Sequence, residues 1–290
     1  MARKRPSTAH GLVLIDKPAG LTSHDVVYKL RGLLREKRIG HAGTLDPDAT
    51  GLLVIGVGNG TRLFRFMADM DKTYSCEIVF GSETDSLDDS GVVTATHEMA
   101  PPNIEQVRKI IAEQFLGEIL QVPPMVSALK VDGVRLHKLA RQGIEIERPA
   151  RPITIHSFEV EPTDDPMVLK ATVRSGSGTY VRALGADLGT ALGGGAHIRT
   201  LRRFAVGPYS IEEASTIEEP VLLSIREAVR HLPVQVLDAS EVEDCHFGRT
   251  RVAWDGDGPW AVVDEVGELV GVFELWRGRI AKPTVVFHAV

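Results

Sequence analysis

Cysteine is almost absent from this chain of 290 residues, which contains only Cys76 and Cys245. The two lie far apart and form no CxxC pair, so the sequence favours a reduced compartment and predicts a cytoplasmic protein. The histidines are scattered without an HxxxH pair, so we expect neither a zinc site nor another bound metal ion.

Long hydrophobic runs are also absent. No run approaches the roughly 20 apolar residues that a membrane helix requires. The run LVLI near the start is followed directly by Asp16 and Lys17, and it is too short for the apolar part of a signal peptide. We therefore expect no membrane segment, and we interpret residues 11–18 as a strand.

The glycine-rich stretches do not match the loops that bind nucleotide phosphates. GVGNGTR lacks the GK[ST] ending of a P-loop, and GSGTY lacks the spacing of a dinucleotide-binding loop. The segment DPD resembles the paired aspartates of phosphoryl-transferring hydrolases, although no apolar strand leads directly into it. A metal-dependent phosphohydrolase that uses Asp46 and Asp48 therefore remains one alternative.

The charges are unevenly distributed along the chain. The net charge is −6, which argues mildly against a nucleic-acid partner. However, residues 1–38 contain nine Lys and Arg against three Asp and Glu, residues 130–151 contain six against three, and residues 231–290 contain five against ten. A local basic face attracts a polyanion even when the total charge is negative. Solvated helix faces would give the same counts, so charge alone does not identify a partner.

Periodic patterns predict strands and helices as far as residue 232. The predicted strands are GLVLIDKP, GLLVIGVG, KTYSCEIVFG, ITIHSFEV, VLKATVRS and RRFAVGPYSI. Pro233 marks a boundary, because the chain beyond it shows short strands separated by turns and no long helix. We expect one unit at residues 1–232 and a small β-rich module at residues 233–290.

Three helices are predicted from the 3.6-residue period and from capping residues. The first, in LTSHDVVYKLRGLLREKR, should be capped by Ser23 or Asp25. Asn103 should begin the second and Gly117 should end it, and a third covers about residues 181–192. The apolar stripe of the first helix is expected to contain Val26, Val27, Leu30, Leu33 and Leu34.

The segment RIGHAGTLDPDATG carries a carboxylate in an unusual setting. Pro47 restricts the preceding Asp46 to extended conformations, and Gly43 and Gly51 let the backbone bend closely around it. A rigid loop of this kind would present one carboxylate at a fixed angle. In isolation the same residues are more typical of an ordinary turn.

Seven segments occur together in a fixed order: LIDKPAGLTSHD, RIGHAGTLDPDATGLL, DKTYSCEI, VPPMVSALKVDG with LARQG, RPITI, SGTYVRALGADLG and GAHIRTLRR. With them the chain, from about Gly11 to Tyr209, resembles the TruB family of tRNA pseudouridine synthases, which isomerise uridine 55 in the T loop. GHAGTLDPDATG is a highly specific signature, although Asp48 stands where the family has an apolar residue. The resemblance implies an α+β pseudouridine synthase fold with a mixed, mainly antiparallel central sheet and flanking helices, followed by a small PUA-like module.

The resemblance also assigns roles in the reaction. Asp46 matches the catalytic aspartate of the family, and Arg182 matches the arginine that pairs with it. Tyr74 matches the active-site tyrosine, whose ring can stack on the target base and whose hydroxyl can move a proton. One nucleophile suffices for the isomerisation, so the resemblance implies no cofactor and no metal ion.

Further matches concern the RNA. His41 matches the histidine that fills the gap left by the flipped nucleotide, and Tyr180 and Leu201 match residues of the substrate pocket. Lys17 is expected at the substrate site, because with Pro18 it forms the KP motif that supports the active-site tyrosine.

Residues 122–150 match an excursion that clamps the RNA stem and should contain a short helix. Its basic side chains would contact phosphates; they are Lys130, Arg135, Lys138 and Arg141. The expected partner is therefore tRNA, bound through its T arm and loop by a monomeric enzyme. The alternative is a binding protein, a tRNA chaperone that folds tRNA without catalysis.

Overall fold

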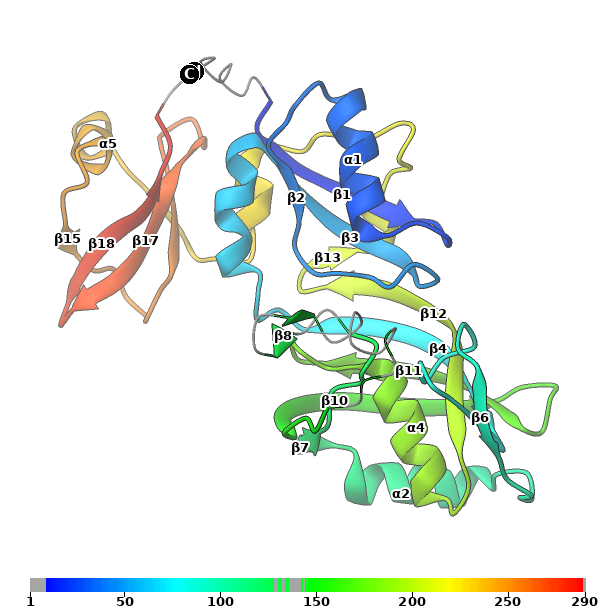
Figure 1. Cartoon of the computed structure of the whole chain (residues 1–290). Helices are drawn as coiled ribbons and strands as arrows, with labels where there is room; N and C mark the ends of the chain where they lie inside the picture. Colours follow the sequence, from blue (N-terminus) through cyan, green and yellow to red (C-terminus); the bar gives the residue numbers. More distant parts are fainter. Residues whose placement is uncertain are drawn as a thin grey trace.

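The computed structural model of the chain describes residues 9–127, 130–131, 134–135, 142, 144 and 146–288. Its largest sheet is mixed and mainly antiparallel, as expected, with β3 and β12 as the one parallel pair (Figure 1). The strands along it, in spatial order, are β1 (Gly11–Lys17), β3 (Thr50–Val57), β12 (Ala196–Val206), β4 (Lys72–Phe80), β11 (Val168–Ser175), β10 (Arg151–Pro162) and β7 (Gly117–Gln121). Two short strands pair with this path, β2 (Ile39–His41) with β3 and β13 (Tyr209–Ser210) with β12.

Helix α1 (Ser23–Leu33) packs beside the β1 end of the sheet, and its cap differs from the prediction. Thr22 is the cap, because it keeps an extended backbone and its hydroxyl accepts from the backbone N–H of Asp25. The Asp25 carboxylate in turn accepts from the N–H of Thr22, so Asp25 completes the cap instead of forming it. Val26, Val27 and Leu30 are buried as predicted, whereas Leu33 is 52% exposed.

Helices α2 (Ile104–Gln114) and α4 (Val181–Ala191) cover the other half of the sheet, the lower half in Figure 1. Asn103 caps α2 as predicted, because its side-chain oxygen accepts from the N–H groups of Glu105 and Gln106. The two helices pack on the sheet through a core of apolar side chains; those of the helices are Val107, Ile111, Val181, Leu184 and Leu188.

Short elements connect these layers. They are η1 (Gly58–Phe66), β5 (Ser82–Thr84), β6 (Val93–Thr96), β8 (Lys130–Val131), β9 (Val134–Arg135), η2 (Ile211–Glu213) and η3 (Ile225–Val229). β5 pairs with β6 and β8 with β9, each as a separate two-stranded sheet. The short helix predicted within residues 122–150 lies largely outside the described residues.

A second sheet forms the β-rich module after residue 233. Its strands, in spatial order, are β14 (Val234–Val236), β16 (Trp260–Val263), β17 (Leu269–Arg277), β18 (Ile280–Val286) and β15 (Arg251–Val252). The module also contains α5 (Ala239–His246), which the sequence patterns did not reveal. Within the ranges given above, no helix is long and apolar enough to span a membrane.

The module and the large sheet share one apolar core. η1 and η3, cyan and yellow in Figure 1, lie between the two sheets. Leu12, Leu14 and Leu63 on one side pack in the same cluster as Val272 and Val285 on the other. The module is thus fixed against the sheet by buried side chains and not only by a linker.

Replacing Leu63 by Ala should destabilise the fold strongly, because Leu63 is fully buried in this shared core. We expect a loss of about 3 kcal/mol in the free energy of unfolding, the typical effect of deleting a buried leucine side chain. Leu33→Ala is the matched control and should change it by less than about 0.5 kcal/mol, since Leu33 is exposed. Denaturant unfolding measures both; equal effects would contradict the shared core.

Candidate active site

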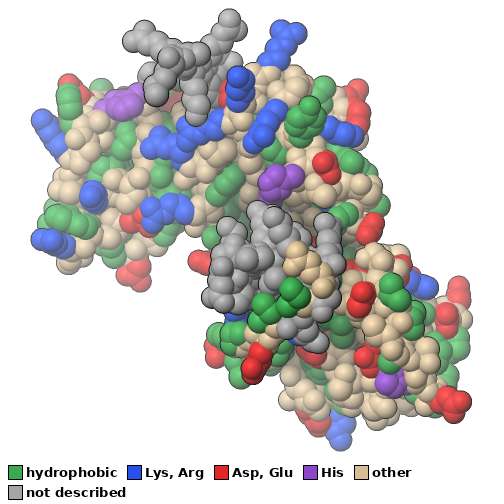
Figure 2. Space-filling view, viewed as in Figure 1, with side chains coloured by type: hydrophobic (Ala, Val, Ile, Leu, Met, Phe, Trp, Pro, Cys, Tyr) green, Lys and Arg blue, Asp and Glu red, His purple; other side chains and the backbone are tan. Residues whose placement is uncertain are grey.

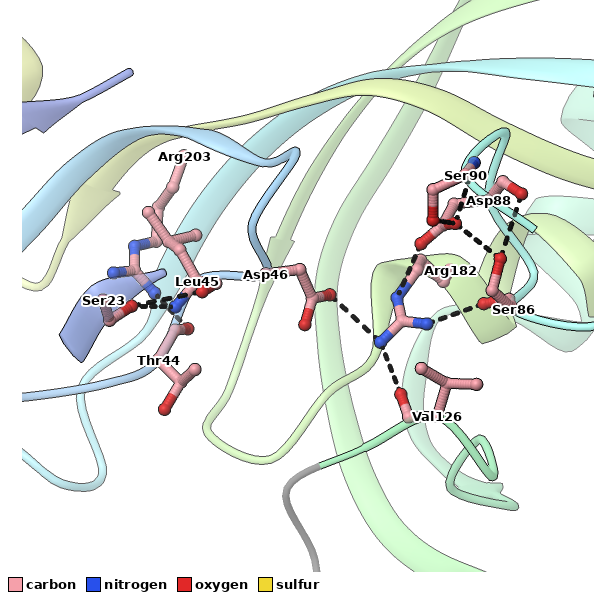
Figure 3. Close-up of polar contacts among 10 residues, drawn as sticks. All are labelled: Ser23, Thr44, Leu45, Asp46, Ser86, Asp88, Ser90, Val126, Arg182 and Arg203. Atoms are coloured by element: carbon pink, nitrogen blue, oxygen red, sulfur yellow. Dashed lines mark hydrogen bonds and ion pairs between the residues drawn. The ribbon is translucent and has the colours of Figure 1, made fainter. Parts of the chain in front are cut away.

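The loop between β2 and β3 carries Asp46, which forms an ion pair with Arg182 (Figure 3). The carboxylate Oδ2 lies 3.0 Å from the Arg182 Nη2. The Asp46 side chain is 42% exposed and that of Arg182 only 4%. A buried cation thus holds a carboxylate that still faces solvent.

Arg182 has three further partners, which come from other parts of the chain (Figure 3). Its Nη1 donates to the carbonyl of Ser86 at 2.6 Å, and its Nη2 donates to the carbonyl of Val126 at 2.9 Å. Its Nε lies 3.5 Å from the Asp88 carboxylate. One guanidinium therefore fixes the Asp46 loop, the β5–β6 turn and the start of the excursion relative to one another.

Asp88 is itself held in place by its neighbours. Its Oδ1 accepts from the hydroxyls of Ser86 and Ser90, both at 2.6 Å. Asp88 consequently presents its other oxygen to Arg182 from the side opposite Asp46 (Figure 3).

The backbone of the Asp46 loop is bound from behind by side chains of three other elements. The Lys17 ammonium donates to the Pro47 carbonyl at 2.9 Å. The Ser23 hydroxyl donates to the Leu45 carbonyl and accepts from the Leu45 N–H, at 3.1 and 2.9 Å. The third is Arg203, whose guanidinium reaches the carbonyls of Gly43 and Thr44. The loop is short, irregular and still tightly anchored.

A cavity of about 410 Å³ opens beside the Asp46 carboxylate. The structure brings five of the predicted site residues together in its lining: Asp46, Tyr74, Tyr180, Arg182 and Leu201. Aromatic, aliphatic and charged side chains thus meet in one recess large enough for a nucleobase. Among the described residues, no group of three His, Cys, Asp or Glu side chains is arranged to hold a metal ion.

Lys17 corrects an expectation. It is fully buried, and besides Pro47 its ammonium donates to the carbonyls of Pro18 and Leu21 at 2.9 and 2.6 Å. Burial lowers the pKa of Lys17 to about 8, and the charges of Asp48 and Asp46 partly oppose that shift. With three carbonyl partners and no exposed surface, Lys17 supports the loop instead of contacting substrate.

His41 lies at the start of the same loop but outside the cavity lining. Its ring meets that of His24 edge to face, with centroids 5.4 Å apart. Burial, the neighbouring His24 and then Arg203 lower the pKa of His41, so the ring is neutral at pH 7. A neutral ring is suited to stacking or insertion.

The basic residues of the excursion cannot be placed. Arg141 and Lys138 lie outside the described residues, and for Lys130 and Arg135 only membership of β8 and β9 is described. Their expected phosphate contacts stay a prediction.

Several residues of the site gave no signal of their own in the sequence. The sequence patterns indicate Ser23 only as a helix cap and Arg203 only as part of a motif, and they assign no role to Asp88. Lys72 also lines the cavity, where burial and then Arg203 lower its pKa. Alternation along a strand would show that one of the two neighbouring residues Arg202 and Arg203 faces inward, although not which one.

Comparison with solved structures places the fold in a class. The chain resembles, at 22% identity and a TM-score of 0.72, a chain of the "Structure of H/ACA RNP bound to a substrate RNA containing 2'-deoxyuridine", over 96% of this chain and 85% of that one. A chain of a Cbf5-Nop10-Gar1 complex matches at 23% identity and a TM-score of 0.71, over 97% and 84%. These similarities establish the fold alone, that of the pseudouridine synthases.

The sequence comparisons identify the family. The model of the TruB family pseudouridylate synthase N-terminal domain matches residues 31–181, and that of the tRNA pseudouridylate synthase B C-terminal domain matches residues 182–229. Proteins named tRNA pseudouridine synthase B are 41% identical in Arthrobacter sp. (96% of each chain) and 39% identical in Streptomyces coelicolor (98% of this chain, 99% of the relative). The chain belongs to the TruB family, which confirms the resemblance found in its motifs.

Replacing Asp88 by Asn should slow the reaction about tenfold, because the variant removes one of the two charges that orient Arg182 while leaving Asp46 intact. Asp89→Asn is the control, since Asp89 is the exposed neighbour and no described contact links its side chain to Arg182. Steady-state kinetics on tRNA measures both. Equal rates in the two variants would show that Asp88 does not act through Arg182.

Proposed function

We propose that this enzyme, a tRNA pseudouridine synthase, isomerises uridine 55 in the T loop of tRNA with Asp46 as its nucleophile. The observation that carries the proposal is the solvent-facing Asp46 carboxylate, paired with the buried Arg182 at the wall of a base-sized cavity. Curated relatives over nearly the whole chain bear the name tRNA pseudouridine synthase B.

The reaction requires little more than this site contains. The N1–C1′ bond of uridine breaks, the base rotates, and C5 forms a new bond to C1′, so no atom is gained and none is lost apart from a proton that leaves C5 and one that is taken up at N1. A single carboxylate can serve as the nucleophile. Attack on the base, attack on the sugar and a glycal route each require only one carboxylate. Arg182 supplies its counter-charge when bound RNA excludes water from the cavity.

The cavity also suits a base that has left its stack. Extruding a base costs a few kcal/mol, which stacking in a pocket offsets. In the proposal Tyr74 and Leu201 contact the uracil, Tyr180 borders it, and the neutral ring of His41 fills the gap left in the RNA. In the proposal the Tyr74 hydroxyl moves a proton.

The distribution of charge favours RNA binding on one face of the molecule. On the face shown in Figure 2, Lys and Arg gather over the upper half, whereas Asp and Glu dominate the lower half. Phosphate contacts from basic side chains supply most of the affinity of such complexes. We propose that the T arm lies against this face, with phosphates bound by Lys130 and Arg141 of the excursion.

The remaining parts of the proposal concern organisation. We propose a division into a catalytic unit at 1–232 and a PUA-like RNA-binding module at 233–290, since the two sheets contain separate strands. We further propose a monomer that acts in the cytoplasm without a cofactor or metal ion. A tRNA-folding chaperone activity is compatible with the same surface and is separable from catalysis.

Asp46→Asn should make no measurable pseudouridine, because the substitution keeps the shape of the side chain and removes its charge and nucleophile. RNA binding should persist, since phosphate contacts dominate affinity. Pseudouridine is mapped in a tRNA transcript incubated with the purified protein, and a filter-binding assay measures affinity. A thermal melt first confirms that the variant is folded, because Arg182 loses its partner.

Asp48→Asn is the matched control, since Asp48 is exposed two positions away. Equal turnover in the two variants would overturn the assignment of the nucleophile. If the wild-type protein binds tRNA but modifies no position, the result would support the alternative of a tRNA chaperone without catalysis. EDTA should not change the rate; loss of activity with EDTA would instead support the metal-dependent alternative.

Tyr74→Phe and Tyr74→Leu separate the two roles of the tyrosine. If the hydroxyl transfers a proton, Phe should bind tRNA nearly as well as wild type and react about 100-fold more slowly. Leu should weaken binding as well, because it also loses the aromatic face. Rapid-quench measurement of pseudouridine gives the rate, and a wild-type rate for Phe would leave stacking as the only role.

A further inference from the structure

Arg203 lies between two parts of the active site. On β12 its backbone pairs with Tyr74 of β4 on one side and with Gly51 of β3 on the other. Gly51 is the second residue of β3, directly after the Asp46 loop; its φ is +99°, and a Cβ built there would lie 2.3 Å from the Arg203 carbonyl oxygen. Only glycine permits this approach, so the start of β3 is held directly against Arg203.

The Arg203 side chain turns back to the same loop. Its Nε donates to the carbonyl of Leu52 at 2.8 Å, and its two terminal nitrogens donate to the carbonyls of Thr44 and Gly43 at 3.4 and 3.3 Å. Its Cζ lies 6.0 Å from the centroid of the Tyr74 ring. One side chain thereby contacts the backbone on both sides of Asp46 and the face of Tyr74.

The charge of Arg203 is compensated in an unusual way. The residue is 1% exposed, and among the described residues no carboxylate lies within 4.0 Å of its nitrogens. A buried cation without a counter-ion is costly unless polar groups satisfy it, and here carbonyl oxygens of the loop do so. The loop must keep those carbonyls directed at the guanidinium. The guanidinium donates to these carbonyls from three separate nitrogens in one plane, whereas a lysine ammonium would donate from a single atom, so lysine does not reproduce this geometry.

We propose that Arg203 is a positioning residue for the isomerisation, which fixes the backbone of the Asp46 loop and the ring of Tyr74 relative to each other. It acts through these two residues and does not touch the reacting atoms. The inference rests on the proposed roles of Asp46 and Tyr74. Misplacing a catalytic group by about 1 Å can cost a factor of about 100 in rate, so positioning of this kind is measurable.

The test is Arg203→Lys, which keeps the positive charge and loses the planar set of N–H donors. The single-turnover rate constant is measured with enzyme in saturating excess over tRNA, because under that condition it does not depend on the fraction of enzyme that is folded. We expect it to fall about tenfold or more, with the Kd for tRNA within about twofold of wild type, the range that neutral surface changes give. Arg174→Lys on β11 is the matched control; the Arg174 side chain is 58% exposed and pairs with Asp71, and the substitution should leave the rate unchanged.

Each outcome of this experiment either supports the proposal or overturns it. A near-wild-type rate constant for Arg203→Lys overturns the proposal, and so does an equal loss of rate and affinity, which would mean that Arg203 binds RNA directly. If Arg203→Lys does not fold, Ser23→Ala tests whether anchoring of the Asp46 loop sets the rate. The uncharged Ser23 hydroxyl forms two hydrogen bonds with the backbone of Leu45 in that loop. Ser23→Ala should also lower the single-turnover rate constant while Kd is kept, and an unchanged rate constant would overturn the proposal. Absence of pseudouridine formation by the wild-type protein would instead refute the proposed function.

Discussion

The buried guanidinium of Arg182 is the constraint around which the active site is arranged. A charged group that is 4% exposed must have all its polar directions satisfied. Arg182 achieves this with the carboxylates of Asp46 and Asp88 and with two carbonyls, and these partners come from segments far apart in the sequence. Helix α4 places Arg182 against the sheet, and the loops that carry its partners must therefore lie close to its guanidinium. The position of the Asp46 carboxylate is therefore a consequence of satisfying one cation.

The Asp46 loop shows how a short irregular segment is made rigid. Its own residues form no regular structure, but Lys17, Ser23 and Arg203 bind its backbone from behind. All three supporting side chains are buried and belong to regular elements of the scaffold. A carboxylate held in this way needs little rearrangement when substrate arrives, which is the basis of electrostatic preorganisation. The flexibility that a Gly-rich loop would otherwise have is removed by contacts outside it.

The sequence predicted the secondary-structure elements more accurately than the contacts between residues that are distant in the chain. The strand patterns and the Asn103 cap of α2 depend on local periodicity and local hydrogen bonds, so they could be read directly. The cap of α1 was misplaced by one to three residues, because Thr22, Ser23 and Asp25 are all good capping residues and only backbone geometry selects among them. The burial of Leu63 against the module depends on a segment some 200 positions away, and no local pattern encodes it.

The residues of the candidate active site likewise fall into those that the sequence predicted and those that it did not. Family motifs brought Asp46, Tyr74 and Arg182 together, although they lie far apart in sequence. The orientation of Arg203 depends instead on two irregularities in the pairing of β12 with β4, between Arg199 and Arg202 and between Arg203 and Ala205. Irregularities of this kind shift which side chains face inward, and alternation along a strand cannot foresee them.

The hydrogen bond from Arg182 to the Val126 carbonyl connects the start of the excursion to the cation that pairs with Asp46. Two sites that share a partner are thermodynamically linked, and linkage is reciprocal. A change in the position of Val126 therefore also changes the positions open to the Asp46 carboxylate, and a group bound beside that carboxylate acts on the position of Val126 in return. Under the proposed function, recognition of the RNA stem is then coupled to chemistry at the base, so a poorly fitting stem would lower the rate as well as the occupancy.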